Sequence, residues 1–193
     1  KKMKRRTAIG GILGLAGIGY ISITGVKYFI DNSNKERGQL DAHINLIAEL
    51  AEVIIPTTNA SPGAKSAEVQ VYIINYMEDC TSLKEYNNFL NGLNNLQEDC
   101  KNTYNQTFED CSATQKIQLV EGLDNNWVSK GILLKINNKL LGRSFFSILK
   151  TLTIEGYCTS SIGATKLLAY NHIPGKYKAI TNLGKNQKSW ATK

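Results

Sequence analysis

The N-terminus combines a basic leader with a long uncharged segment, and this pairing limits how the rest of the chain can fold. Five positive charges among residues 1–6 precede residues 8–26, which carry no charged side chain over 19 positions. At about 1.5 Å per residue, a helix of this length crosses a hydrocarbon core roughly 30 Å thick. We therefore predict that residues 1–30 are an export signal or an uncleaved membrane anchor, and that the remainder folds separately.

Two features of this leader indicate its route and its orientation. Arg5 and Arg6 stand just before the uncharged segment, as in signals of the twin-arginine route for folded proteins. Positive charges collect before the segment and only Lys27 follows closely, so we expect a cytoplasmic N-terminus and a domain on the periplasmic side of a bacterial inner membrane. No small-x-small cleavage site follows, which favours a retained anchor. A buried core helix is the alternative, but such helices are usually shorter.

The net charge of +7 is spread unevenly along the chain. Residues 1–30 carry +6, residues 31–155 carry −5, and residues 156–193 carry +6 from six lysines without any acid. The body is therefore mildly acidic, which argues against nucleic-acid binding. Only the basic C-terminal end remains as a contact for an acidic partner.

The four cysteines are Cys80, Cys100, Cys111 and Cys158, and none has the spacing of a zinc site. Thiols tend to oxidise outside the cytoplasm. We expect one disulfide among the first three, which lie close in sequence, and leave its pairing open. The apolar surroundings of Cys158 indicate a buried thiol.

Apolar side chains recur at helical spacing along most of the chain, and no long segment alternates with period two. This pattern predicts an all-α fold with a linker over residues 31–38, a compact helical domain over 39–170 and an extended basic tail over 171–193. Ser112 with Gln115 has the spacing of a capping box, and Ser160 or Ser161 is predicted to cap a short sixth helix that reaches Tyr170. The five main stripes are Leu40, Ile44, Ile47, Ala51 and Ile54; Val69, Tyr72, Ile73, Tyr76 and Met77; Tyr86, Phe89, Leu90, Leu93 and Leu96; Ile117, Val120 and Leu123; and Phe145, Phe146, Leu149 and Leu152.

Candidate catalytic groups are few. His43 and His172 lie far apart, without a nucleophile, metal ligand or carboxylate at a useful spacing. Glu49 and Glu52 share a helical face, but solvated glutamates at this spacing are common in amphipathic helices. We expect no catalytic residue, no metal site and no cofactor site in this chain.

Two blocks of sequence resemble the gluconate 2-dehydrogenase subunit 3 family. The first comprises residues 48–56 (AELAEVIIP), 61–64 (SPGA) and 69–80 (VQVYIINYMEDC). The second comprises residues 145–160 (FFSILKTLTIEGYCTS), 163–165 (GAT), Tyr170 and 173–177 (IPGKY). The order, the spacing and the Pro-Gly-x-Tyr ending carry the resemblance. Cys158 departs from it, since the family commonly has a bulky apolar residue there.

The resemblance implies an accessory role in a dehydrogenase of sugars or sugar acids. Its large partner would be a glucose-methanol-choline type oxidoreductase that holds FAD and passes electrons to an acceptor such as a c-type cytochrome. This chain would lend its signal, support folding and attach the complex to the membrane. The alternative is a membrane-anchored helical scaffold subunit of an unrelated cell-envelope complex.

We place the partner interface between Tyr157 and the basic tail. Tyrosine is favoured at interfaces because it joins a large apolar body to a polar end. Pro174 and Gly175 can let the tail leave the domain as an arm, and its lysines would complement an acidic surface. Tyr157 and Tyr170 could instead fill this domain's own core. The candidate interface residues are Tyr157, Thr159, Ser160, Gly163, Tyr170, Pro174, Gly175 and Tyr177.

Overall fold

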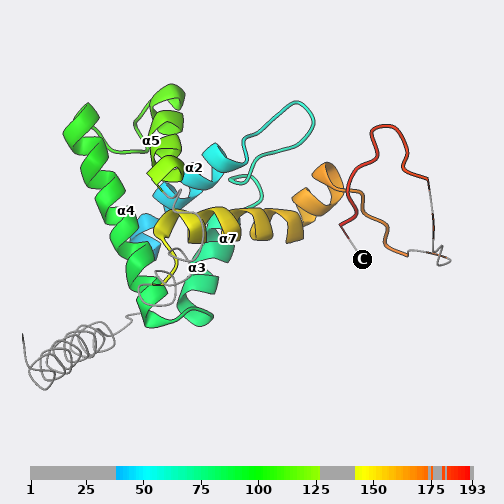
Figure 1. Ribbon diagram of the computed structural model, residues 1–193, viewed down its shortest axis with the longest axis horizontal. Helices are drawn as coiled ribbons and strands as arrows, with labels where there is room; N and C mark the ends of the chain where they lie inside the picture. The colour runs from blue at the N-terminus through cyan, green and yellow to red at the C-terminus, as the bar shows by residue number, and fades with distance from the viewer. Residues whose placement is uncertain (1–37, 127–141, 174, 176–179, 181, 192–193) are drawn as a thin grey trace, which may run out of the picture. The chain divides into compact units, whose positions relative to one another are not determined.

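The computed structural model describes residues 38–126, 142–173, 175, 180 and 182–191, and this part of the chain is helical (Figure 1). One isolated bridge, between Ala169 and Trp190, is the only strand-like pairing in these ranges, so the all-α class is confirmed for them. The predicted leader, with Arg5 and Arg6, lies outside them. Within the described ranges, no helix has both the length and the hydropathy to span a membrane. The elements are η1 (Asp41–His43), α2 (Ile44–Ile54), α3 (Val69–Asp79), α4 (Leu83–Tyr104), α5 (Ala113–Asn126), α7 (Phe145–Thr159) and η2 (Gly163–Leu167).

Helix α7 is the centre of the core, because it packs against α2, α3 and α4 (Figure 1). Its first turn meets α4, where the rings of Phe89 and Phe145 lie 5.3 Å apart between centroids. The approach is close enough that a Cβ at Gly92 would overlap Phe145. The largest fully buried side chains are Tyr86, Tyr157, Phe89, Phe108, Leu40, Leu46, Ile47, Leu50, Ile73, Met77, Leu93 and Ile148.

Serine side chains begin three of the helices. Ser82 accepts a hydrogen bond from the backbone N–H of Glu85 at the start of α4, and Ser144 does the same for α7. The predicted capping box at α5 is confirmed: Ser112 N donates to Gln115 Oε1 (2.9 Å), and Gln115 N donates to Ser112 Oγ (3.4 Å). Each of these bonds satisfies a backbone group that has no partner within its own helix.

The chain between α4 and α5 forms a compact turn, which we call the α4–α5 corner (residues 105–112). Asn105 ends α4 in the left-handed conformation, with φ of 55°. The Gln97 side chain holds the corner against α4, since its Oε1 accepts from Phe108 N (3.0 Å) and its Nε2 donates to Glu109 Oε2 (2.8 Å). The Phe108 side chain is thereby fixed in the core.

The predicted stripes agree with the buried faces, with two exceptions at helix surfaces. Ile117 is 48% exposed, because α5 faces the core through Val120, and Ile44, the first residue of α2, is 36% exposed. The sixth helix is shorter than predicted. It ends with η2 at Leu167 rather than at Tyr170, since Leu168 is extended and the backbone of Ala169 pairs with the end of the chain instead.

Candidate functional site

The candidate residues for acid–base or metal chemistry lie on different segments of the described ranges. There, no group of three or more His, Cys, Asp or Glu side chains could hold a metal ion. His43 lies half-buried at the end of η1. His172 is exposed after η2, with its Nδ1 3.2 Å from the hydroxyl of Tyr170.

Glu49 is committed to an ion-pair cluster that joins α2 to two other segments. Its carboxylate binds the ammonium of Lys65, and its Oε2 lies 2.8 Å from Nζ of Lys116 in α5. Partial burial raises the pKa of Glu49, but hydrogen bonds from Lys116 and Lys65 outweigh this effect and leave the pKa below its usual value. The carboxylate is therefore held as an ionised structural group.

Glu52 closes the loop that connects α2 to α3. Its Oε1 accepts from both the backbone N–H and the hydroxyl of Thr57 (2.8 and 2.7 Å), and its Oε2 accepts from Lys65 N (2.9 Å). Gly63 packs so closely that a Cβ there would overlap this carboxylate. Because all these donors lie outside α2, the sequence spacing of Glu49 and Glu52 gave no sign of this role.

Tyr157 links α7 to the same loop. Its side chain is fully buried, and its hydroxyl donates to the carbonyl oxygen of Pro62 at 2.5 Å. The aromatic ring thus belongs to this domain's core, which was the alternative left open by the sequence. Tyr157 supports the root of the predicted interface and offers no side-chain surface to a partner.

A tight hydrogen-bonded turn follows Tyr157 and contains three of the predicted interface residues, Thr159, Ser160 and Gly163. Ser160 Oγ donates to the carbonyl of Tyr157 (2.7 Å) and accepts from the N–H of Gly163 (3.0 Å), so one hydroxyl ends α7 and begins the next turn. Gly163 is buried, and a Cβ there would overlap the carbonyl of Tyr157. Thr159 is exposed but its hydroxyl donates to Glu155 O (2.7 Å). Of these positions, only Thr159 presents its side chain to solvent.

The chain beyond Leu167, which we call the terminal segment (residues 168–191 as far as they are described), returns to its own starting point. Ala169 N donates to Ser189 O (2.8 Å), and Ala191 N donates to Ala169 O (2.9 Å). Lys188 Nζ donates to the carbonyl of Lys166 (2.5 Å). The prediction of an extended tail therefore needs correction, because these bonds close the segment into a loop.

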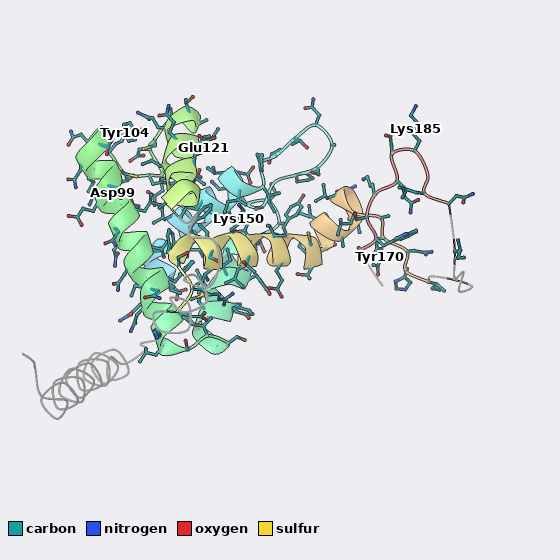
Figure 2. All side chains as sticks on the ribbon, viewed as in Figure 1. Asp99, Tyr104, Glu121, Lys150, Tyr170 and Lys185 are labelled. Carbon is teal, nitrogen blue, oxygen red and sulfur yellow. The ribbon has the colours of Figure 1, made fainter. Side chains whose placement is uncertain are left out.

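The terminal segment exposes apolar side chains among its lysines, and Figure 2 marks Tyr170 and Lys185 on it. Gly175 has a left-handed φ of 74° and open space around it, consistent with the predicted turn. Pro174 and Tyr177 lie outside the described residues. Sequence reasoning missed Trp190, although an aromatic residue in a lysine-rich stretch is a recognisable interface signal. The exposed apolar side chains here and in η2 are Leu167, Tyr170, Ile173, Ile180, Leu183 and Trp190.

The cysteines occupy different environments. Cys80 is exposed at the end of α3, Cys158 is partly buried in α7, and Cys100 and Cys111 are both buried. All four are free thiols in this structure. The predicted disulfide stays a prediction, and its pairing is taken up below.

The sequence of the helical domain described above matches the model of a known protein family. The family model for gluconate 2-dehydrogenase subunit 3 matches residues 41–175, from η1 through η2 to Gly175. No curated protein and no solved structure matches the chain. The match covers most of the chain, including all of the first sequence block and the second block as far as Gly175. The chain is therefore a member of the gluconate 2-dehydrogenase subunit 3 family.

Proposed function

We propose that this chain is the non-catalytic small subunit of an exported, flavin-dependent dehydrogenase of sugars or sugar acids. The observation that carries the proposal is the family match over the helical domain. The engagement of Glu49 and Glu52 in an ion-pair cluster and in loop closure supports a structural role for these carboxylates. The partner is a glucose-methanol-choline type subunit that holds FAD, and a c-type cytochrome is the proposed electron acceptor.

The leader adds export and attachment to this role. Arg5 and Arg6 would direct the folded pair of subunits through the twin-arginine route, so that the flavoprotein acquires FAD in the cytoplasm before it is carried out. A retained residue 8–26 segment would then hold the complex on the periplasmic side of the inner membrane.

The terminal segment is the proposed contact with the catalytic subunit. Its apolar side chains are the most exposed of the described domain, reaching 90% at Ile180 and 85% at Leu183. The lysines of residues 156–193 have no acidic neighbour in that range, so the surface they flank suits an acidic rim on the partner. The proposed contact residues in this segment are Tyr170, Pro174, Gly175 and Tyr177. The root of the segment is fixed by Tyr157, Ser160 and Gly163.

Co-purification tests the proposal. The full chain carrying an affinity tag is isolated from its native cells in mild detergent, and the bound proteins are identified together with the visible absorbance spectrum. We expect a flavoprotein in stoichiometric amount, whose flavin absorbance stays with it when the subunits are separated. Recovery of a transport or secretion assembly without flavin would instead support a scaffold subunit of an unrelated envelope complex. Stoichiometric flavin on the isolated chain would overturn the non-catalytic assignment.

A further inference from the structure

Two of the four cysteines meet at the α4–α5 corner. Cys100 lies in the last turns of α4 and Cys111 lies near the end of the corner, with exposures of 0% and 5%. Gln97, one turn before Cys100 in α4, accepts a hydrogen bond from Phe108 N (3.0 Å), and Cys111 N donates to Phe108 O (3.2 Å). The corner therefore folds back against the turn of α4 that carries Cys100, and the nearby thiol of Cys111 contributes to the raised pKa of Cys100. The side chain of Gln106 donates to Sγ of Cys111 (3.5 Å) and to Oε1 of Gln115 (3.2 Å), which ties the second cysteine to the start of α5.

We propose that Cys100 and Cys111 are the pair that forms the disulfide of this chain, and that the bond locks the α4–α5 corner. In the cell the proposal rests on export to an oxidising compartment, as described above. The pairing itself rests on the position of the two thiols in the folded corner.

Helix geometry excludes the other pairings that the sequence left open. Cys80 precedes α4, whereas Cys100 is near its far end, so the helical rise separates them by roughly 25 Å. Bridged cysteines have Cα atoms no more than about 7 Å apart. Because Cys111 lies beside Cys100, Cys80 is out of reach of both.

Cys158 is remote from Cys80 for a similar reason. Gly156, one half-turn before Cys158, packs on Val69 and Tyr72 in the first turn of α3. Cys80 follows the other end of that helix, about 15 Å away along its axis. These two cysteines are therefore expected to remain thiols.

Formation of the bond removes two protons and two electrons from the two thiols. The oxidant is a disulfide, such as oxidised glutathione or the active-site disulfide of a thiol oxidoreductase, and it is reduced to two thiols. Burial, followed by the proximity of Cys111, raises the pKa of Cys100 to about 12, so the closed corner keeps this thiol protonated. Exchange therefore takes place while the corner is open, during folding or local unfolding.

Peptide mapping tests the pairing, because trypsin places each cysteine in a different peptide. The full chain, purified reduced, is unfolded and refolded in a glutathione redox buffer, alkylated without reduction and digested. We expect residues 85–101 linked to residues 102–116, with alkylated cysteines in residues 66–84 and 151–166. A link that involves residues 66–84 or 151–166, or alkylation of all four cysteines, would overturn the proposal.

Variants separate the pairing from general effects on folding. The double variant Cys80→Ser/Cys158→Ser should form the same link in the same yield, whereas Cys111→Ser should form none. The oxidised wild-type chain should unfold at a temperature about 5–10 °C above the reduced chain, a difference absent in Cys111→Ser. Equal unfolding temperatures for the oxidised and reduced wild-type chains would show that the disulfide does not stabilise the α4–α5 corner. Cell fractionation measures export in a separate experiment. A chain that is not exported can therefore still show the Cys100–Cys111 link after refolding in vitro.

Discussion

The hydroxyl of Tyr157 donates a hydrogen bond to the carbonyl oxygen of Pro62 over a distance of 2.5 Å, although 95 residues separate the two in sequence. The bond joins the last turns of α7 to the loop that Glu52 closes from α2. The last turns of α7, the α2–α3 loop and α2 are therefore joined directly before the turn from which the terminal segment leaves.

Replacement of Tyr157 by Phe should destabilise the domain by about 1–2 kcal/mol. The variant keeps the buried ring but leaves the partly buried carbonyl of Pro62 without its donor, and an acceptor left unsatisfied in this way costs about this much. Denaturant unfolding followed by circular dichroism measures the change. Tyr170→Phe is the matched control, because this hydroxyl is exposed and its loss should change stability by less than about 0.5 kcal/mol.

Alanine at Gly63 and alanine at Gly122 should have opposite effects. A Cβ at Gly63 overlaps the Glu52 carboxylate and displaces it from Thr57 and Lys65, which we expect to cost about 2–3 kcal/mol. Gly122 lies in α5 with open space around its Cα, so Ala should stabilise the helix by about 0.5–1 kcal/mol. Thermal unfolding of both variants checks the signs, and a neutral Gly63→Ala would contradict the tight loop closure.

Acid should weaken the domain partly through Glu49 and Glu85. Both pKa values are lowered from 4.5, that of Glu85 chiefly by the hydrogen bond from Arg143. A lowered folded-state pKa contributes stability above the unfolded value, and this contribution is lost as pH falls through the folded value. Glu49→Gln and Glu85→Gln should each be less stable than wild type near pH 7 by up to about 1 kcal/mol. The difference should shrink below about pH 4.5 and vanish at lower pH.

Urea unfolding between pH 7 and pH 3 measures this convergence. Glu121→Gln serves as the control, since Glu121 is exposed on α5 and should parallel wild type throughout. Curves for Glu49→Gln that stay parallel to wild type into acid would show that Lys116 and Lys65 do not favour its ionised form.

Deletion of residues 174–193 should leave a folded helical domain that no longer retains the catalytic subunit. The helices that form the core all precede this cut, so the far-ultraviolet circular dichroism per helical residue should be preserved. Co-purification of the flavoprotein measures retention, with Ile117→Ala as an exposed apolar control outside the terminal segment. Full retention by the truncated chain would remove the terminal segment as a main contact.

Replacement of Arg5 and Arg6 by Lys should keep both this chain and its flavoprotein partner in the cytoplasm. The twin-arginine route recognises the paired arginines and not only their charge. The control variant Lys2→Arg/Lys4→Arg keeps Arg5 and Arg6 and should be exported normally. Immunoblots of cytoplasmic and periplasmic-side fractions measure the distribution. Normal export of the flavoprotein with the Arg5→Lys/Arg6→Lys chain would show that the partner does not depend on this signal.

The helices could be predicted from the sequence because their determinants are local. The Ser112–Gln115 capping box and the apolar spacing of Val69, Ile73 and Met77 involve residues within a turn or two of one another. Ile117 fits its stripe equally well yet is exposed, because the width of a buried face depends on which neighbour covers it.

The contacts that build the candidate site depend on tertiary structure and escaped prediction. In the sequence, nothing distinguishes Glu52 from a solvated glutamate. The backbone N–H of Lys65 that it binds is 13 residues away and comes close only in the folded chain. The pairing of Ala169 with the segment around Trp190 uses backbone groups alone, which carry no sequence signature. Tyr157 was a candidate interface residue because of its residue type, and the sequence alone did not reveal that its side chain is buried.

The double role of the Ser160 hydroxyl has a consequence for the entropy of association. Because this group ties the end of α7 to Gly163, the backbone at the root of the terminal segment is already ordered in the free chain. Ordering one residue costs about 1–2 kcal/mol in conformational entropy. In this chain the root is ordered during folding, so binding of a partner does not include that cost. For the same contact area, a partner should therefore bind this chain more tightly than one whose segment leaves through a flexible linker.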